Sequence, residues 1–244
     1  MTSPRRVLLL SNSTQHGRRY LDHAEEEIVR FLEGTRRVVF FPYALSDRDA
    51  YARQARDRFA QMGIQLDAPA TADSARFAID SAECFFTGGG NTFRLLRALQ
   101  DMGLVDPIRS RVAAGVAYIG SSAGSIVAGP TIRTTKDMPI VEPRSFSSLG
   151  LVPFQISPHY LDPDPTSTHM GETQEERIRQ FHEENDAPVA GLREGSILRV
   201  EGDCVHLCGV AGARLFRRGE TPAERLPGAD ITLDLLQTTA ERAT

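Results

Sequence analysis

Short apolar runs alternate with polar, helix-compatible segments over the first half of the chain. Four runs of mostly apolar residues resemble strands that are buried on both faces of a parallel sheet. They occupy residues 7–10, 38–41, 84–87 and 116–119. The segments between them have spacings typical of helices, at 20–32, 47–62, 72–82, 92–102 and 106–114. Alternating strands and helices of these lengths predict a parallel sheet with helices on both faces.

The last third of the chain has a different pattern. Residues 197–200, 204–208 and 214–216 are short strand-like segments joined by glycine-containing turns. We expect them to be antiparallel edge strands of the same domain. The predicted fold is a three-layer α/β/α sandwich with a mostly parallel central sheet, in a single domain that spans residues 1–244.

Composition and charge argue against several classes of protein. The chain has 244 residues, of which 41% are hydrophobic and 25% are charged, as in an ordinary globular domain. A formal net charge of −4 with scattered arginines argues against nucleic acid as a partner. The N-terminal apolar run is too short for a signal peptide or a membrane span, so we expect no membrane association. Three cysteines do not suggest a disulfide framework, which favours a cytoplasmic protein. The sequence leaves open whether the protein is a monomer or a homodimer.

Residues 120–124, Gly-Ser-Ser-Ala-Gly, match the pattern G-x-S-x-G between an apolar strand and a helix-compatible segment. Small neighbours allow a sharp turn that holds the Ser122 hydroxyl above the edge of the sheet. The helix that follows would present free N–H groups to developing negative charge. Ser122 is therefore a candidate nucleophile. The alternative is an ordinary glycine- and serine-rich loop, which α/β proteins often contain.

A serine nucleophile needs a base, and the base needs an acceptor that orients it. Among six histidines, His159 follows an apolar run at 151–156 and lies in a rigid Ser-Pro-His-Tyr turn that can direct an imidazole. Two carboxylates are candidates for the acid. Glu194 lies on a turn after a predicted strand, and Asp137 lies closer in sequence to Ser122. The pattern does not choose between them, and either could be a solvated loop residue.

A triglycine segment, residues 88–90, follows a predicted strand and precedes Asn91 and a helix. Glycine lets the backbone approach a ligand closely and present its N–H groups. Amides near Gly89 and Gly90 could form an oxyanion hole with the amide of Ala123, and such donors contribute about 3 kcal/mol each in a transition state. A phosphate cradle is a weaker alternative, because neither G-x-G-x-x-G nor the Walker pattern is present. A plain tight turn is the other.

Cys204, His206 and Cys208 would share one face of a strand. Their spacing is not that of a zinc knuckle, and no fourth ligand lies nearby in the sequence. We therefore interpret them as half-buried strand residues, and we expect neither a metal site nor a cofactor.

Several stretches taken together resemble peptidase E, the aspartyl dipeptidase family of cytoplasmic serine peptidases, family S51. They are residues 8–14, 88–93, 118–120, 122–124, 130–135, 137–141, 158–159 and 171–173. The resemblance implies a class I glutamine-amidotransferase-like, flavodoxin-like fold and the hydrolysis of small peptides with an N-terminal aspartate. It implies Ser122 as nucleophile and His159 as base. It favours Glu194 as the acid and keeps Asp137 as a further site residue.

One position departs from the family pattern. The Asp-specific members carry an arginine directly after Gly-Glu-Thr, whereas this chain has Gln174. A neutral amide cannot form the bidentate ion pair of a guanidinium with a substrate carboxylate. Arg133, Arg177 or Arg179 could compensate for the missing charge. We therefore predict a dipeptidase with a relaxed preference for the first residue of its substrate.

Three other functions are compatible with parts of the pattern. An esterase-like hydrolase shares G-x-S-x-G, but its acid precedes its histidine, which would select Asp137 rather than Glu194. A cyanophycinase-like enzyme would cleave aspartate-containing polymers on a related fold. A catalytically inactive module could instead bind a small anion at the triglycine segment.

Overall fold

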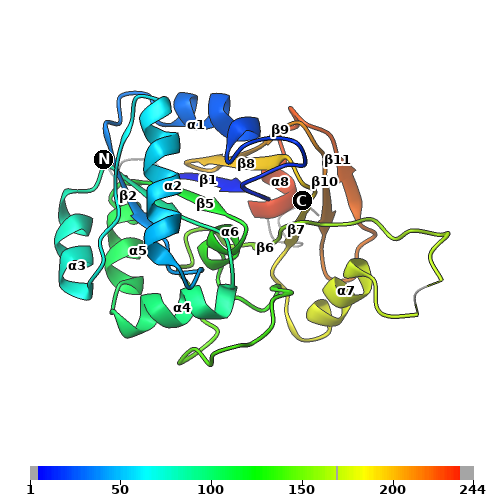
Figure 1. Ribbon diagram of the computed structural model, residues 1–244. Coiled ribbons are helices and arrows are strands. Elements are labelled where there is room, and N and C mark those ends of the chain that lie inside the picture. The colour runs from blue at the N-terminus through cyan, green and yellow to red at the C-terminus, as the bar shows by residue number, and fades with distance from the viewer. Residues whose placement is uncertain (1–4, 169, 237–244) are drawn as a thin grey trace.

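Two β-sheets form the framework of the computed structural model, which describes residues 5–168 and 170–236 (Figure 1). The larger sheet has the order β3-β2-β4-β5-β1-β8-β9, and the smaller has the order β11-β10-β7-β6. The strands of the larger sheet are β1 (Arg6–Leu10), β2 (Arg37–Phe41), β3 (Gln65–Asp67), β4 (Cys84–Thr87), β5 (Ala117–Ser121), β8 (Ser196–Glu201) and β9 (Cys204–Gly209). Those of the smaller sheet are β6 (Gln155–Ser157), β7 (Val189–Leu192), β10 (Ala213–Phe216) and β11 (Ala223–Arg225).

The larger sheet is mostly parallel, as predicted. Strands β3, β2, β4, β5 and β1 run in the same direction, and β8 and β9 follow as antiparallel edge strands. The apolar run at residues 7–10 is fully buried in β1. A strand that is covered on both faces needs such a continuous run, because neither side of it meets water. The α/β fold class with antiparallel edge strands is thus confirmed.

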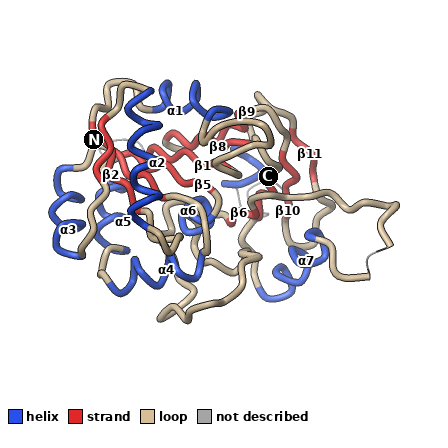
Figure 2. The backbone as a smooth tube through the Cα atoms, viewed as in Figure 1, coloured by secondary structure: helices blue, strands red, loops and turns tan. Residues whose placement is uncertain are grey.

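Helices cover both faces of this sheet (Figure 2). They are α1 (Glu25–Phe31), preceded by the short 3-10 helix η1 (Asp22–Ala24), α2 (Arg48–Gln61), α3 (Ala72–Ser81), α4 (Thr92–Asp101), α5 (Val105–Ala113), α6 (Ala123–Ala128) and α8 (Thr232–Leu236), whereas α7 (Gln174–Glu184) packs on the smaller sheet. Alternation along β1 divides the core, since Leu8 and Leu10 pack with residues of α1 and α2. Val7 and Leu9 pack with residues of α3 to α6.

Polar caps begin four of the helices. The side chains of Asp47, Thr71, Asn91 and Thr173 each accept a hydrogen bond from the backbone N–H three residues later. A cap of this kind typically stabilises a helix by about 1 kcal/mol, because it satisfies an N–H that has no partner within the helix. Asn91 therefore begins α4 directly after the triglycine segment.

The second, smaller sheet was not part of the prediction. Residues 214–216 belong to β10, which pairs antiparallel with β7 in the smaller sheet and not with the edge of the larger one. Strand β6 pairs parallel with β7, and α7 packs on this sheet through Ile178. The placement of β10 depends on partners far away in the sequence, so its local pattern could not reveal it.

The two sheets meet at the carboxyl ends of β1 and β7. Ser11, which follows β1, donates its hydroxyl to the carbonyl of Leu192 at 2.9 Å. The amide of Gly195 donates to Asn12 Oδ1 at 2.8 Å. The carboxyl ends of β4, β5 and β6 lead to the same region, so loops from both sheets converge there.

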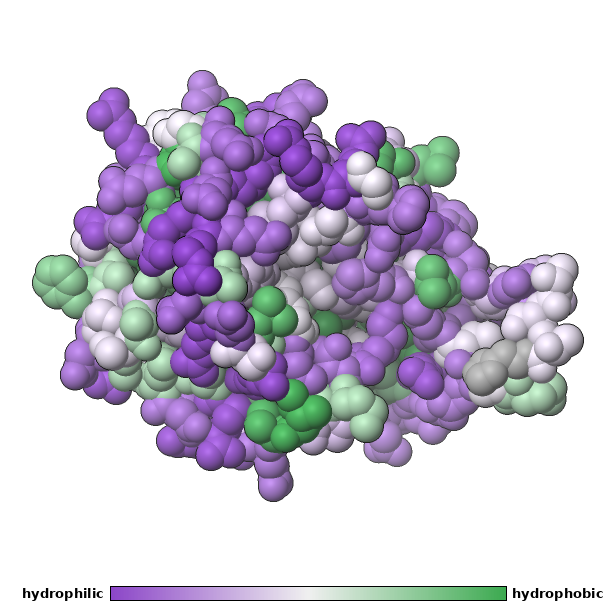
Figure 3. Space-filling view, viewed as in Figure 1, coloured by the Kyte–Doolittle hydropathy of each residue, from purple (hydrophilic) through white to green (hydrophobic). Residues whose placement is uncertain are grey.

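The face shown in Figure 3 is predominantly hydrophilic, and it is hollowed near its centre, where the two sheets meet. Within residues 5–168 and 170–236, no helix has the length and apolar character needed to cross a bilayer.

Candidate active site

A sharp turn places Ser122 between β5 and α6. Its backbone has φ 51° and ψ −109°, a conformation that residues other than glycine rarely adopt. Its N–H donates to the carbonyl of Leu10 at 3.0 Å, and Ser125 Oγ lies 2.9 Å from the carbonyl of Gly120. Gly124 packs so closely on Thr87 that a Cβ there would overlap the Thr87 carbonyl. The surrounding structure thus fixes a strained turn that exposes the Ser122 hydroxyl, as a nucleophile elbow requires.

His159 and Glu194 come from the smaller sheet. The parallel pairing of β6 with β7 brings the turns after these strands together. Ser122 Oγ lies 3.0 Å from His159 Nε2, and His159 Nδ1 lies 2.9 Å from Glu194 Oε1. Because an ionised carboxylate can only accept, Nδ1 carries the ring hydrogen and Nε2 is free to accept from the hydroxyl. The three residues form one continuous hydrogen-bonded chain.

Hydrogen bonds to both the N–H and the carbonyl hold the backbone of His159. It has a positive φ of 51°, and its N–H donates to Ser11 Oγ at 2.9 Å. Its carbonyl accepts from Lys136 Nζ at 3.0 Å and from Gln174 Nε2 at 3.1 Å. Burial lowers the pKa of the Lys136 ammonium to about 8, an effect that the neighbouring Asp137 carboxylate opposes. Lys136 was not predicted from the sequence, because it has no motif of its own.

Asp137 hydrogen-bonds to two threonines and not to the histidine. Its Oδ2 accepts from the Thr92 amide at 2.7 Å, from the Thr92 hydroxyl at 2.6 Å and from the Thr135 hydroxyl at 3.2 Å. No hydrogen bond to His159 is present among the described residues. Of the two carboxylates that the sequence offered, Glu194 therefore lies beside the imidazole, while Asp137 joins the start of α4 to the loop that contains it.

Two of the three predicted oxyanion donors are available. The amide of Gly89 already donates to the hydroxyl of Tyr51 at 2.9 Å. The amides of Gly90 and Ala123 have no hydrogen-bond partner within the described part of the chain. These two amides could therefore stabilise an oxyanion next to Ser122.

Tyr51 fixes the position of the triglycine segment, a role that the sequence did not reveal. Its ring lies so close to Gly88 that a Cβ there would overlap it, and its hydroxyl accepts from Gly89. Tyr20 packs edge-on against Tyr51 and donates to its hydroxyl at 3.5 Å. Burial raises the pKa of both phenols, so both keep their protons at neutral pH.

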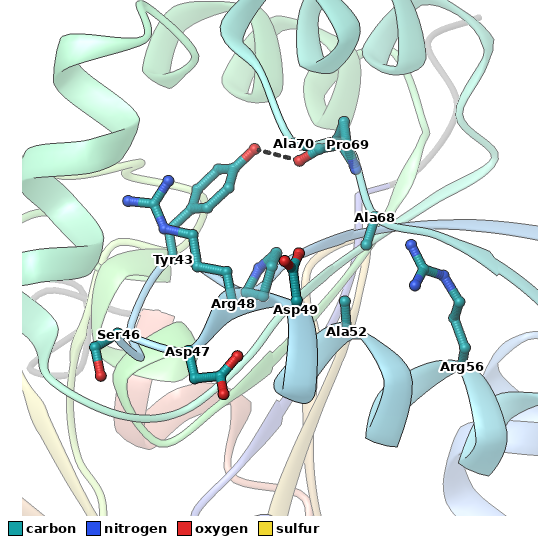
Figure 4. Close-up of a pocket in the computed structure, with 11 residues that line it drawn as sticks. Tyr43, Ser46, Asp47, Arg48, Asp49, Ala52, Arg56, Ala68, Pro69 and Ala70 are labelled. Atoms are coloured by element: carbon teal, nitrogen blue, oxygen red, sulfur yellow. Dashed lines mark hydrogen bonds between the residues drawn. The ribbon is translucent and has the colours of Figure 1, made fainter.

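We expect Tyr51→Phe to lower kcat about 10-fold with little change in KM, because the Gly89 amide loses its acceptor and the neighbouring oxyanion donor shifts. Steady-state kinetics with a dipeptide substrate measure kcat and KM for both proteins. Tyr43→Phe is the matched control, since the buried Tyr43 hydroxyl donates to the carbonyl of Pro69 at 3.2 Å in a separate cavity (Figure 4). Equal losses of kcat in both variants would contradict a specific role for Tyr51.

The cleft above Ser122 has a volume of about 490 Å³. It is lined by Asn12, Ser13, Thr14, Tyr20, Leu45, Tyr51, Gln54, Gly89, Gly90, Ser122, Asp137 and His159. Nucleophile, base and the triglycine segment thus share one cavity with Asp137. The cavity in Figure 4, of about 310 Å³, lies instead beyond the ends of β2 and β3 and contains none of these residues.

Three predicted substrate-binding side chains do not line this cleft. Asn91 caps α4, and its Nδ2 donates to the carbonyl of Met138 at 2.8 Å. The Arg133 guanidinium lies over the ring of Phe146, 5.4 Å from its centre. Gln174 is engaged at both ends, because its Oε1 also accepts from a backbone amide at 3.2 Å. The cap at Asn91 could have been anticipated, since asparagine before a helical segment is a common N-cap.

Arg133 and Gln174 instead line a second, smaller cavity of about 60 Å³ together with Lys136 and Arg177. It adjoins the active site, because Lys136 and Gln174 both donate to the carbonyl of His159. Arg179, the third arginine predicted to compensate for Gln174, does not line it and pairs with Glu175.

Within residues 5–168 and 170–236, no three or more His, Cys, Asp or Glu side chains are grouped as a metal site would require. Cys204, His206 and Cys208 alternate along β9, with Cys204 exposed and the other two partly buried.

The chain is similar in sequence to known peptidases. The model of the family described as "Peptidase family S51" matches residues 7–208. "Peptidase E" of Streptomyces coelicolor is 55% identical over 226 residues, which cover 93% of each chain. A protein of Drosophila melanogaster named "Probable alpha-aspartyl dipeptidase" is 45% identical over 240 residues, covering 97% of this chain and all of that one.

The fold is also found in a solved peptidase structure. The crystal structure of a peptidase from an acI-B1 actinobacterium superposes with a TM-score of 0.70 at 15% identity, covering 94% of this chain and 97% of that one. The family match and the extent of both sequence relatives leave one conclusion: the chain belongs to peptidase family S51.

Proposed function

We propose that the protein is a serine-type dipeptidase in which Ser122, His159 and Glu194 form the catalytic triad. The observation that carries this proposal is the continuous chain of two hydrogen bonds, 3.0 Å and 2.9 Å long, that joins these residues at the cleft. The geometry is that of a nucleophile, a base and an acceptor that orients the base. Membership of a peptidase family supports the same reaction.

The reaction proceeds through an acyl-enzyme. Ser122 Oγ attacks the scissile carbonyl while His159 Nε2 takes its proton. The amides of Gly90 and Ala123 donate to the oxyanion of the tetrahedral intermediate. His159 then gives the proton to the leaving amine, and the peptide C–N bond breaks. A water molecule, activated by the same imidazole, hydrolyses the ester and restores Ser122.

We propose dipeptides with N-terminal aspartate as substrates, with a relaxed preference at this first position. The name of the Drosophila relative supports an aspartyl dipeptide. Gln174 supports the relaxed preference, because its amide offers no charge and both of its ends are hydrogen-bonded to backbone. Lys136, in the adjoining cavity, is a cation, but its ammonium is engaged by two carbonyls.

A panel of Xaa-Leu dipeptides tests the preference. Asp-Leu and Asn-Leu have nearly the same shape and differ in charge, so their ratio of kcat/KM isolates the recognition of the side-chain carboxylate. Without a free guanidinium we expect a ratio below about 30-fold, whereas a bidentate ion pair would give more. Cleavage of Asp-Leu alone would overturn the relaxed preference without affecting the triad.

We also propose that the peptidase acts on small peptides in the cytoplasm. All three thiols, those of Cys84, Cys204 and Cys208, are free, which supports a reducing compartment. The reaction written above requires no metal ion and no cofactor.

A further inference from the structure

Asp137 differs chemically from the rest of the cleft wall. Of the residues that line the cavity above Ser122, it alone carries a carboxylate, and no lysine or arginine lines the cavity. The other side chains in the wall are hydroxyls, amides, two phenols, one leucine and the imidazole of His159. A carboxylate in this position will bind a cation in preference to a neutral group or an anion.

The carboxylate is fixed by one of its two oxygens. Oδ2 receives all three hydrogen bonds, from the amide and hydroxyl of Thr92 and from the hydroxyl of Thr135. Oδ1 has no hydrogen-bond partner within residues 5–168 and 170–236. The neighbouring ammonium of Lys136 does not pair with it, because Lys136 Nζ donates to the carbonyls of Pro158 and His159. One oxygen is thus held in place and the other is available.

The position of Asp137 suits the α-ammonium group of a dipeptide. In a dipeptide the α-nitrogen is two bonds from the scissile carbonyl carbon, which places it within about 2.5 Å of that atom. An anchor for the α-ammonium must therefore share the cavity of the nucleophile, as Asp137 does with Ser122. Thr92, which holds the carboxylate, follows the proposed oxyanion donor Gly90 by two residues.

We propose that Asp137 Oδ1 binds the free α-ammonium group of the substrate's first residue. This inference rests on the proposed dipeptidase activity and adds the feature that confines it to unblocked N-termini. Asp137 is then a substrate-binding residue and not a member of the triad. It selects peptides by their terminus, whatever side chain the first residue carries.

The test pairs Ala-Leu with propionyl-leucine, which is the same molecule without the amine. For the wild type we expect kcat/KM to be about 30-fold or more higher for Ala-Leu, because a charged hydrogen bond is lost with the amine. In Asp137→Asn we expect this ratio to fall to within a few-fold of one, while the rate with propionyl-leucine is retained. Equal losses on both compounds would show a structural role only and would overturn the proposal.

Asp47→Asn is the matched control. Asp47 also accepts from a helix N-terminal amide, at 2.9 Å from the Ala50 nitrogen, but it lies in the remote cavity of Figure 4. We expect this variant to keep the wild-type ratio. Asparagine keeps an acceptor oxygen at both sites, and thermal unfolding of both variants verifies that they fold.

Binding separates this proposal from the proposed activity. Calorimetric titration of Ser122→Ala with Ala-Leu and with propionyl-leucine measures the same preference without turnover. Suppose that binding of Ala-Leu is favoured through Asp137 but the wild type hydrolyses no dipeptide. The ammonium-binding role of Asp137 would then be supported, and the proposed dipeptidase activity would be overturned. If instead the wild type hydrolyses dipeptides and the preference for Ala-Leu does not depend on Asp137, the dipeptidase activity would be supported and the role of Asp137 would be overturned.

Discussion

Ser122→Ala is expected to lower kcat for dipeptide hydrolysis by about 10⁴-fold or more, because the attacking oxygen is removed. The alanine variant keeps the two oxyanion amides and the cleft, so substrate binding should change little. Hydrolysis of Asp-Leu and Ala-Leu, followed by release of free leucine, measures the loss. A serine-directed phosphonate should label the wild type and leave the variant unmodified.

Ser121→Ala controls for the substitution itself. Ser121 is the preceding residue and is fully buried, and its hydroxyl has no hydrogen-bond partner within the described part of the chain. Removal of the Ser121 hydroxyl should leave kcat within about 3-fold of the wild type, because no neighbouring group loses a hydrogen bond. Retention of more than a few per cent of activity in Ser122→Ala would remove Ser122 from the mechanism.

The parallel half of the fold could be predicted because its signals are local. The apolar run at residues 7–10 and its three counterparts lie within β1, β2, β4 and β5, or one residue from them. Such runs need only be long enough for a strand and bounded by polar residues or glycine. The helix expected from residue 20 is shorter, because η1 precedes α1, and Gly34 follows with a φ of 82°.

The smaller sheet could not be predicted, because its pairings join distant segments. Strand β10 at residues 213–216 pairs with β7 at 189–192, although β9 is closer in the sequence. Nothing in the apolar pattern of residues 214–216 distinguishes these two partners. The choice depends on side-chain packing between strands, which a single sequence does not display.

The candidate site shows the same division. Ser122 lies in a local motif, and His159 was indicated by the turn that contains it. Tyr51 reaches the triglycine segment from 38 residues away in the sequence, and it is a buried residue of a largely polar helix, where a core role explains it equally well. Glu194 could not be distinguished from Asp137 until the pairing of β6 with β7 placed it beside the imidazole.

Glu194→Gln is expected to lower kcat about 10³-fold with KM nearly unchanged. Glutamine has the shape of glutamate, but its NH₂ group can donate to His159 Nδ1 and so favours the tautomer with hydrogen on Nε2. That tautomer cannot accept the Ser122 proton. The effect should be smaller than at a buried triad, because the side chains of His159 and Glu194 are 40% and 51% exposed and water can partly replace the carboxylate.

Asp137→Asn is the comparison that gives this result its meaning, because both carboxylates lie near the site and both changes remove one negative charge. Loss of Glu194 should slow acylation of Ser122 by every substrate, including propionyl-leucine and a small ester such as p-nitrophenyl acetate. Loss of Asp137 should spare those two compounds, since neither carries an ammonium group. If Asp137→Asn slowed p-nitrophenyl acetate as strongly as Glu194→Gln did, the acid of the triad would have to be reassigned. If Glu194→Gln left the hydrolysis of Ala-Leu, propionyl-leucine and p-nitrophenyl acetate unaffected, the hydrogen bond at 2.9 Å between His159 and Glu194 would have no part in catalysis.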